Sequence, residues 1–308
     1  MNSYYAALQQ DALLHVSGPD TLTFLQGQVT CDTRKLDAGH ALLGAYCTPQ
    51  GRVVCDFLLC QLAPGHCALR MRRAIREDAA AAFGKYIIFS KAEIEAARED
   101  WPPVVCWGDS ASQILADTFG GAPGGYLDAR TGEGFAVVQV DRAGRQFECY
   151  VDRAVYPDLP VHLAQHLAAA DENQWRALQV ASGVARIESP TVGEFIPQML
   201  NYDSTGHISF NKGCYTGQEV VARLHYRGQS KRRLYLARMA GAAAADSGTP
   251  LYCADSAQSV GSVVNSAPDG SDASLVLVTA TAAGADSGLH LATPDGPALA
   301  LLPLPNEV

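Results

Sequence analysis

Long apolar runs are missing from this sequence of 308 residues. Its uninterrupted apolar stretches cover only a few residues, whereas a membrane-spanning helix needs about 20. The opening segment, MNSYYAALQQDALLHV, also lacks the basic and continuously apolar parts of a secretory signal and the arginine-rich pattern of a transit peptide. We therefore expect a cytoplasmic protein that does not contact a membrane.

Closely spaced cysteine pairs are missing as well. Nine cysteines are scattered along the chain, with no C-x-x-C pair and no cysteine and histidine spacing typical of a zinc site. An odd, scattered set indicates reduced thiols. Cys55, Cys60 and Cys149 lie in strand-like apolar runs and are expected to be buried. No metal site is predicted.

Positive charge is absent from the C-terminal part of the chain. From Met239 to Val308 there is no lysine or arginine, while seven acids there carry most of the net charge of −9. The remainder is nearly balanced and includes basic runs such as residues 70–76. An acidic protein is not expected to bind bulk nucleic acid, but a small anionic ligand or a local RNA contact stays open.

The pattern of apolar runs predicts two mixed α+β parts. A chain of this length suggests two or three domains. Turn residues separate strand-like runs in the first hundred residues, and a similar mixture resumes after Pro103. The predicted elements are a strand at 11–16, a helix starting near Asp20 as N-cap, a strand meander over 41–73, a helix within 75–89, a strand at 104–107, a helix at 110–119, a hairpin around 141–145 and a helical stretch over 162–184.

From about Lys231 the sequence changes character. Short runs rich in Val, Leu and Thr recur at roughly 8 to 12 residue spacing, with Gly, Asp, Ser and Pro between them. This pattern is typical of a small all-β barrel or sandwich. The sequence thus predicts an α+β unit at 1–100, a second at 101–230 and a β-barrel at 231–308, with segments exchanged between the first two units as one option.

The candidate chemistry lies in NKGCYTGQEVVARLHYRG, residues 211–228. Thr216 and Glu219 match the S/T-x-x-E pattern of a capping box, which predicts a helix start. Cys214 would then lie near the positive helix N-terminus and the Lys212 ammonium, and both favour thiolate over thiol. A structural cysteine in a glycine-rich turn is the alternative, because no general base is fixed beside it in sequence.

A basic series follows this motif and contains no acid. These side chains could bind an anionic tail, a phosphate, an RNA or a client protein. Equally, they could form the solvated face of a helix and of an edge strand, with no ligand. Its members are Arg223, Arg227, Lys231, Arg232, Arg233 and Arg238.

The segment K-G-C-Y-x-G-Q-E, from Lys212 to Glu219, resembles the signature of the YgfZ family of folate-binding proteins, whose mitochondrial relatives act in iron–sulfur protein maturation. Further blocks resemble the family in the same order over residues 10–235, with a gap at roughly 100–180. They are FLQGQVTCD (24–32), GAYCTPQGRVVCDFLL (44–59), FGKYIIFSKAEI (83–94), ARIESP with FIPQMLNYDSTGHISFNKGCYTGQE (185–219) and ARLHYRGQSKRRLY (222–235).

This resemblance implies a fold and a set of site residues. The fold would be the three-domain cloverleaf of the glycine-cleavage T-protein: two α+β units with antiparallel sheets and a C-terminal β-barrel, around a central hole that receives tetrahydrofolate. The residue tied to activity would be Cys214, with Lys212 beside it as a second catalytic candidate. The rest of the motif carries over as Gly213, Tyr215, Gly217, Gln218 and Glu219.

Candidate folate contacts follow from the same resemblance. Glu148 is similar in position to the pterin-binding glutamate of the T-protein, with a strand-edge charge as the alternative. Asp56 occupies one position of the T-protein's paired acids, whereas the other is Cys55, which argues against aminomethyl transfer. The arginines Arg223 and Arg227 would suit the glutamyl tail. Weaker candidates are Asp32, Asn201 and Glu188.

The function that the resemblance implies is tetrahydrofolate binding in support of iron–sulfur cluster assembly or repair, with a link to tRNA modification. Expected partners are folate and iron–sulfur client or assembly proteins, and we expect a monomer. One alternative is a folate-dependent transferase of the aminomethyltransferase type. Another is a scaffold that docks a client protein or RNA through residues 223–238. The sequence does not indicate whether the protein catalyses a reaction.

Overall fold

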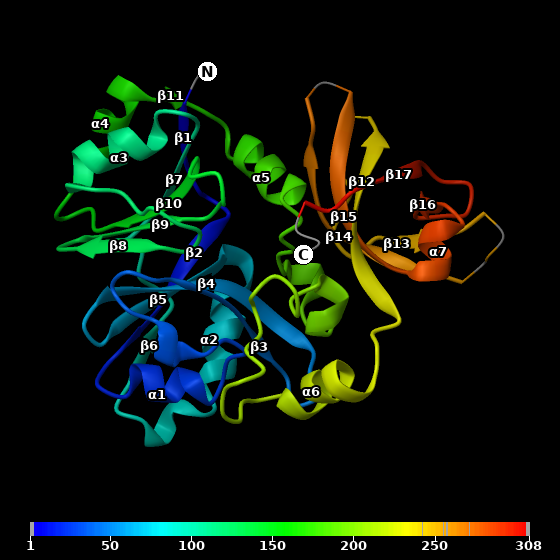
Figure 1. Ribbon diagram of the computed structural model, residues 1–308, viewed down its shortest axis with the longest axis horizontal. Coiled ribbons are helices and arrows are strands. Elements are labelled where there is room, and N and C mark those ends of the chain that lie inside the picture. The colour runs from blue at the N-terminus through cyan, green and yellow to red at the C-terminus, as the bar shows by residue number, and fades with distance from the viewer. Residues whose placement is uncertain (1–2, 242, 255, 257, 271, 306–308) are drawn as a thin grey trace. The chain divides into compact units, whose positions relative to one another are not determined.

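The computed structural model describes residues 3–241, 243–254, 256, 258–270 and 272–305 (Figure 1). The chain divides into two compact units. The first comprises residues 1–44, 57–172 and 211–215, and the second comprises 45–56, 173–210 and 216–308. Among the described residues, no helix has both the length and the apolar character needed to cross a membrane.

One sheet of the first unit has the strand order β11-β1-β7-β10-β9-β8. Its pairs are antiparallel, except that β1 runs parallel to β11. The hairpin expected around 141–145 is confirmed as the β9–β10 connection. The strands are β1 (Tyr4–Ala7), β7 (Pro103–Trp107), β8 (Ala129–Gly132), β9 (Phe135–Gln139), β10 (Gln146–Val151) and β11 (Ala168–Ala169).

A second, five-stranded sheet has the order β3-β4-β5-β2-β6. The predicted meander over 41–73 is confirmed and ends at Arg72, and Gly65 turns the β4–β5 hairpin with φ +72°. Residues 45–56, at the β3–β4 connection, belong to the second unit. The strands are β2 (Asp11–Ser17), β3 (Leu42–Cys47), β4 (Val53–Ala63), β5 (His66–Arg72) and β6 (Glu93–Glu95).

Helices of the first unit confirm most of the predicted positions. The N-cap of the first helix is Asp20, as predicted, but its carboxylate accepts a hydrogen bond from the Lys91 amide at 2.8 Å instead of capping the helix. The helices are α1 (Thr21–Gln26), α2 (Arg76–Gly84), α3 (Ala111–Phe119) and α4 (Leu159–His166), with short 3-10 turns η1 (Thr33–Lys35), η2 (Arg73–Ile75) and η3 (Ile87–Phe89).

The prediction of a continuous helix over 162–184 is wrong for the middle of this segment. It is split into α4 and α5 (Glu172–Ala181), and β11 lies between them (Figure 1). The amides of Ala168 and Ala170 donate to the carbonyls of Ser3 and Tyr5 at 2.9 Å. A sheet edge thus offers this alanine-rich segment partners that outweigh its helix propensity.

Two apolar cores stabilise the first unit. One is shared by both sheets, and it joins Leu13 and Leu58 from one to Val138 and Tyr150 from the other. The second core packs helices α3 and α4 against the first sheet, as Figure 1 also shows. The first sheet is therefore covered on both faces, which makes its central strands buried throughout.

The C-terminal part of the second unit is a closed six-stranded barrel with the order β12-β15-β14-β13-β16-β17. The β-prone runs that follow Lys231 form its six strands, so the predicted barrel is confirmed. Valines and leucines fill its interior, among them Leu251, Val263, Val276 and Val278. The strands are β12 (Arg232–Ala240), β13 (Pro250–Tyr252), β14 (Gly261–Pro268), β15 (Ala273–Thr281), β16 (Leu289–Leu291) and β17 (Ala298–Leu302).

Shorter elements complete the second unit. They are α6 (Gln218–Arg227), α7 (Ala282–Asp286), η4 (Ser189–Thr191) and η5 (Pro197–Leu200). The α+β class with a C-terminal barrel is confirmed. The boundaries 1–100, 101–230 and 231–308 stay a prediction, since the N-terminal strand β1 lies in a sheet otherwise made of residues beyond 100.

Candidate functional site

Lys212 anchors the motif loop to the first unit. Its ammonium donates hydrogen bonds to the carbonyls of Gln26 at 2.8 Å, Val29 at 2.5 Å and Cys31 at 2.8 Å. The ring of Tyr215 lies 5.1 Å from the same nitrogen. Only 8% of Lys212 is exposed, and burial lowers its pKa to about 8. All three ammonium donors are therefore used inside the protein.

The segment that receives Lys212 is itself held together by side chains. The Gln26 carboxamide accepts hydrogen bonds from the Thr33 amide and hydroxyl, each at 2.8 Å, and donates to Asp32 at 3.0 Å. Arg34 forms two further hydrogen bonds with Asp32, and these lower the pKa of Asp32 to about 2. Asp32, a weaker folate candidate, thus uses its carboxylate to hold this segment together. The structure brings the FLQGQVTCD block and the signature motif together.

Cys214 differs from every other cysteine of the chain in its exposure. All nine lie among the described residues; eight are buried and Cys214 is exposed. Burial raises the pKa of Cys31 and Cys47 to about 12. The three apolar-run cysteines predicted to be buried are buried. A thiol that meets solvent in a loop anchored by Lys212 is available to another molecule.

The predicted capping box at Thr216 and Glu219 is wrong. Helix α6 begins at Gln218, and its N-cap is Gly217 in the left-handed conformation, with φ +84° and no capping hydrogen bond from a side chain. A Cβ atom at Gly217 would lie 2.5 Å from the Thr48 carbonyl oxygen, so only glycine fits. At this turn the backbone of Gly217 lies close to the backbone of Thr48, and the S/T-x-x-E pattern does not reveal this contact.

Glu148 lies at the centre of the first sheet and not at an edge, because β10 pairs with both β7 and β9. Its carboxylate binds the Arg70 guanidinium through two hydrogen bonds of 2.7 and 2.5 Å, and the Tyr150 hydroxyl donates to it at 2.6 Å. Glu148 is 1% exposed and Arg70 is 5% exposed. This buried pair joins the two sheets of the first unit, and the strand-edge alternative is wrong.

Asp56 is similarly enclosed in the second unit. It accepts hydrogen bonds from the Arg186 guanidinium and from the Ile187 amide, both at 2.6 Å, and is 2% exposed. The Asn265 carboxamide also binds the backbone of Arg186. Asp56 therefore links the β4 segment to the barrel wall at β14. A folate contact by Asp56 or Glu148 stays a prediction.

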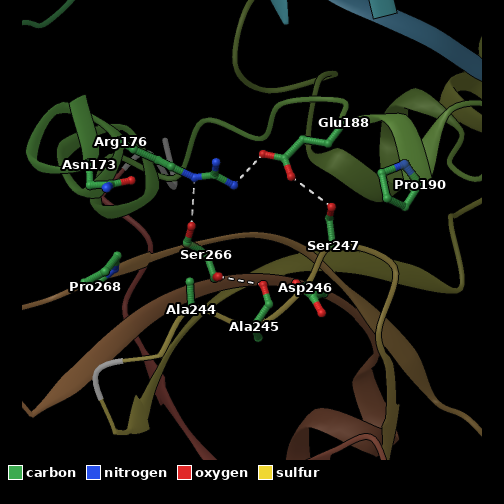
Figure 2. Close-up of a pocket in the computed structure, with 10 residues that line it drawn as sticks. All are labelled: Asn173, Arg176, Glu188, Pro190, Ala244, Ala245, Asp246, Ser247, Ser266 and Pro268. Carbon is green, nitrogen blue, oxygen red and sulfur yellow. Dashed lines mark hydrogen bonds and ion pairs between the residues drawn. The ribbon is translucent and has the colours of Figure 1, made fainter. Parts of the chain in front are cut away.

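A polar pocket of about 510 Å³ lies beside the barrel in the second unit (Figure 2). Arg176 and Glu188 line one side of it and form an ion pair of 2.6 Å. The Ser247 hydroxyl donates to the other carboxylate oxygen of Glu188 at 2.8 Å, and Arg176 donates to the Ser266 carbonyl at 2.9 Å. Glu188 thus builds the pocket wall with both of its carboxylate oxygens engaged.

Arg223 and Arg227 lie exposed on α6, as a ligand for an anion requires. Next to them the structure adds aromatic side chains that the sequence did not single out. The Phe210 ring stacks on His225, with ring centroids 3.6 Å apart and planes at 12°, and Tyr226 lies against both. No pattern of spacing links Phe210 to the helix, because a loop separates them.

One domain family and two relatives match this chain in sequence. The GCVT N-terminal domain family matches residues 10–132. The tRNA-modifying protein YgfZ of Sodalis glossinidius (strain morsitans) is 32% identical over 308 residues, which cover 98% of this chain and 92% of that protein. The protein of that name in Klebsiella pneumoniae (strain 342) is 33% identical over 224 residues, 73% of this chain and 68% of that protein.

Among solved structures, the glycine cleavage system aminomethyltransferase T from Bartonella henselae superimposes with a TM-score of 0.78. The match covers 99% of this chain and 86% of that one, at 15% identity, so it confirms the T-protein-like fold and no more. These relatives confirm the resemblance to the YgfZ family. The chain belongs to the YgfZ protein family.

Proposed function

We propose that this protein binds tetrahydrofolate and uses the Cys214 thiol to support the assembly or repair of iron–sulfur enzymes, including enzymes that modify tRNA. The link to tRNA modification is supported by the name of its relatives, and the folate by the GCVT domain and the T-protein-like fold. The observation that carries the role of Cys214 is its exposure within the signature motif, against eight buried cysteines.

Lys212 gives the thiol a fixed position in this proposal. Its three hydrogen bonds tie the loop to residues 26–31, and the next two residues, Gly213 and Cys214, extend into solvent. A Cβ atom at Gly213 would meet no other atom within 4 Å, which leaves room for an incoming molecule beside the sulfur. We therefore assign Lys212 to positioning the thiol.

The folate candidates differ in how well they fit a folate. Arg223 and Arg227 are exposed and suit the carboxylates of a glutamyl tail. Asp56 and Glu148 are buried and already bind arginines, so neither fits a direct pterin contact in this conformation. We assign each of these two carboxylates to holding its own unit together through its arginine. When bound, tetrahydrofolate would supply a carrier for one-carbon units.

Genetic rescue tests the thiol. In a strain that lacks the protein, we measure the activity of an iron–sulfur enzyme that modifies tRNA, with wild type, Cys214→Ala or Cys214→Ser restored. Both variants are expected to fail to rescue, while their thermal unfolding matches wild type because the side chain is exposed. Cys67→Ala, at a buried cysteine, is the matched control and should rescue. Full rescue by Cys214→Ala would refute a role for the thiol.

Calorimetric titration with tetrahydrofolate under anaerobic conditions tests the cofactor. Saturable binding is expected, and the double variant Arg223→Gln with Arg227→Gln should bind a polyglutamylated folate about tenfold or more weakly, since charge-assisted contacts are lost. Absence of saturable binding by wild type contradicts the folate part of the proposal. Turnover with an aminomethyl-loaded lipoyl carrier would instead favour the transferase alternative.

A further inference from the structure

A cluster of aromatic and basic side chains lies on the surface of the second unit, around helix α6. We call it the α6 patch and define it as Phe210, Arg223, His225, Tyr226 and Arg227. Phe210 and His225 stack face to face, and the Tyr226 ring stands nearly perpendicular to both, at 75° and 81°. Three aromatic rings therefore form one continuous platform.

The patch contributes little to the core of the unit. Tyr226 is 67% exposed, and Arg223, His225 and Arg227 are exposed as well. Helix α6 is held instead at its first turn, where Val221 is fully buried and the Gln198 carboxamide donates to the Val221 carbonyl at 2.7 Å. Clustered aromatic rings that stay in solvent indicate an interaction surface.

The charge of the patch is positive. Arg223 and Arg227 are one helical turn apart, so their guanidinium groups lie on the same side as Tyr226. Within the described part of the chain, neither arginine forms an ion pair with an acid. The nearest acid along the helix is Glu219, and Asp203 is paired with Arg233 at 2.9 Å. In a protein of net charge −9, this positive surface selects an anionic partner.

We propose that the α6 patch binds a single-stranded segment of RNA. Nucleobases stack on exposed aromatic rings, and arginines contact the phosphates between them, so an aromatic platform flanked by two arginines fits this ligand. An acidic protein would also contact the arginines, but it offers no planar bases to stack on the exposed Tyr226 ring. The proposal goes beyond the proposed function, and it requires neither tetrahydrofolate nor the thiol.

Fluorescence anisotropy tests the proposal with a labelled oligouridine of about 15 nucleotides, which spans a typical single-strand site. Wild type is expected to bind it saturably, and Tyr226→Ala to bind it about tenfold more weakly, the effect of losing one stacked base. Arg223→Gln with Arg227→Gln should reduce the slope of log K against log salt by about 1.4, since each phosphate contact contributes about 0.7.

Matched controls come from the first unit. Tyr86→Ala removes another exposed tyrosine, and Lys85→Gln with Arg153→Gln removes the same charge at other exposed positions. These variants should bind RNA as wild type does. Tyr226→Ala should still bind tetrahydrofolate as wild type does. The RNA proposal and the folate proposal are therefore tested by separate measurements on the same variant.

Three results would overturn the RNA proposal. The first is wild-type affinity in both Tyr226→Ala and the arginine double variant. The second is an equal loss of affinity in the controls, which would show that only net charge matters. The third is saturable binding of an acidic client protein through the patch without detectable binding of the oligouridine. In that case the α6 patch is a protein-docking surface.

Discussion

Lys212 is a buried cation with no carboxylate among its three hydrogen-bond acceptors. Backbone carbonyls more than 180 residues away along the chain bind its ammonium instead. Each carbonyl carries only a partial charge, but three of them around one nitrogen satisfy every donor. This arrangement explains how a charged side chain is accommodated at 8% exposure.

Replacing Lys212 with methionine should lower the free energy of unfolding by about 3 kcal/mol, because three enclosed carbonyls lose their donor. Urea denaturation at pH 7 measures the loss. Lys85→Met, at an exposed lysine, is the control and should stay within about 0.5 kcal/mol of wild type. Equal stability of the two variants would contradict the anchoring role of Lys212.

His15 makes the first unit sensitive to acid. It is 1% exposed, its Nδ1 lies 2.9 Å from His66 Nε2, and burial lowers its pKa from 6.5 to about 3. Below pH 6.5 the unfolded chain takes up a proton here that the folded chain does not. Stability is therefore lost as the pH falls from 6.5 toward 3.

Between pH 7 and pH 5, this difference in proton uptake should lower the free energy of unfolding by about 2 kcal/mol. Urea denaturation at the two pH values measures it. The His15→Leu variant should lose most of this dependence, although His66, whose pKa burial also lowers, keeps a part. His166→Leu, at an exposed histidine, should behave as wild type does. Equal acid sensitivity of the His15 variant and wild type would refute the assignment.

At the scale of helices and strands, local patterns predicted most elements but not their partners. The barrel strands β12 to β17 follow from repeated apolar runs and turn residues, and α6 lies in the motif segment where a helix start is predicted. The contacts of Lys212 could not be predicted, because backbone carbonyls occur at every residue. The Arg70 and Glu148 pair, 78 residues apart, carries no local signal either.

The start of α6 depends on one glycine of the motif. Gly217→Ala should destabilise the protein by more than about 1 to 2 kcal/mol, because alanine there would take a positive φ and crowd the Thr48 carbonyl. Gly213→Ala is the matched control from the same motif, with open space around its Cβ position. Thermal unfolding of the two variants gives the comparison. A milder effect at Gly217 than at Gly213 would show that α6 can start in another way.

Over the whole molecule, the cysteines are divided unequally between interior and surface. Eight are inside, and six of them lie on the strands β3, β4, β5, β7 and β10. Buried thiols are small apolar side chains that reagents reach only after unfolding. The described residues also contain no group of three or more His, Cys, Asp and Glu side chains that could hold a metal ion.

Titration with a thiol reagent should therefore give two separate counts. In the folded protein one thiol per chain is expected to react rapidly, and in urea nine should react. In Cys214→Ser the rapid phase should vanish and the count in urea should fall to eight. A second rapid thiol in the folded protein would mean that one of the enclosed cysteines becomes accessible by local opening.

The N-terminal strand β1 also affects the timing of folding. It pairs with β7, about a hundred residues later, and with β11 at Ala168–Ala169. During synthesis, at about 5 to 20 residues per second, the first strand must wait for these partners for several seconds to half a minute. The emerging chain exposes an unpaired strand throughout that interval, and this is the period in which β1 could pair with the wrong segment or with another chain.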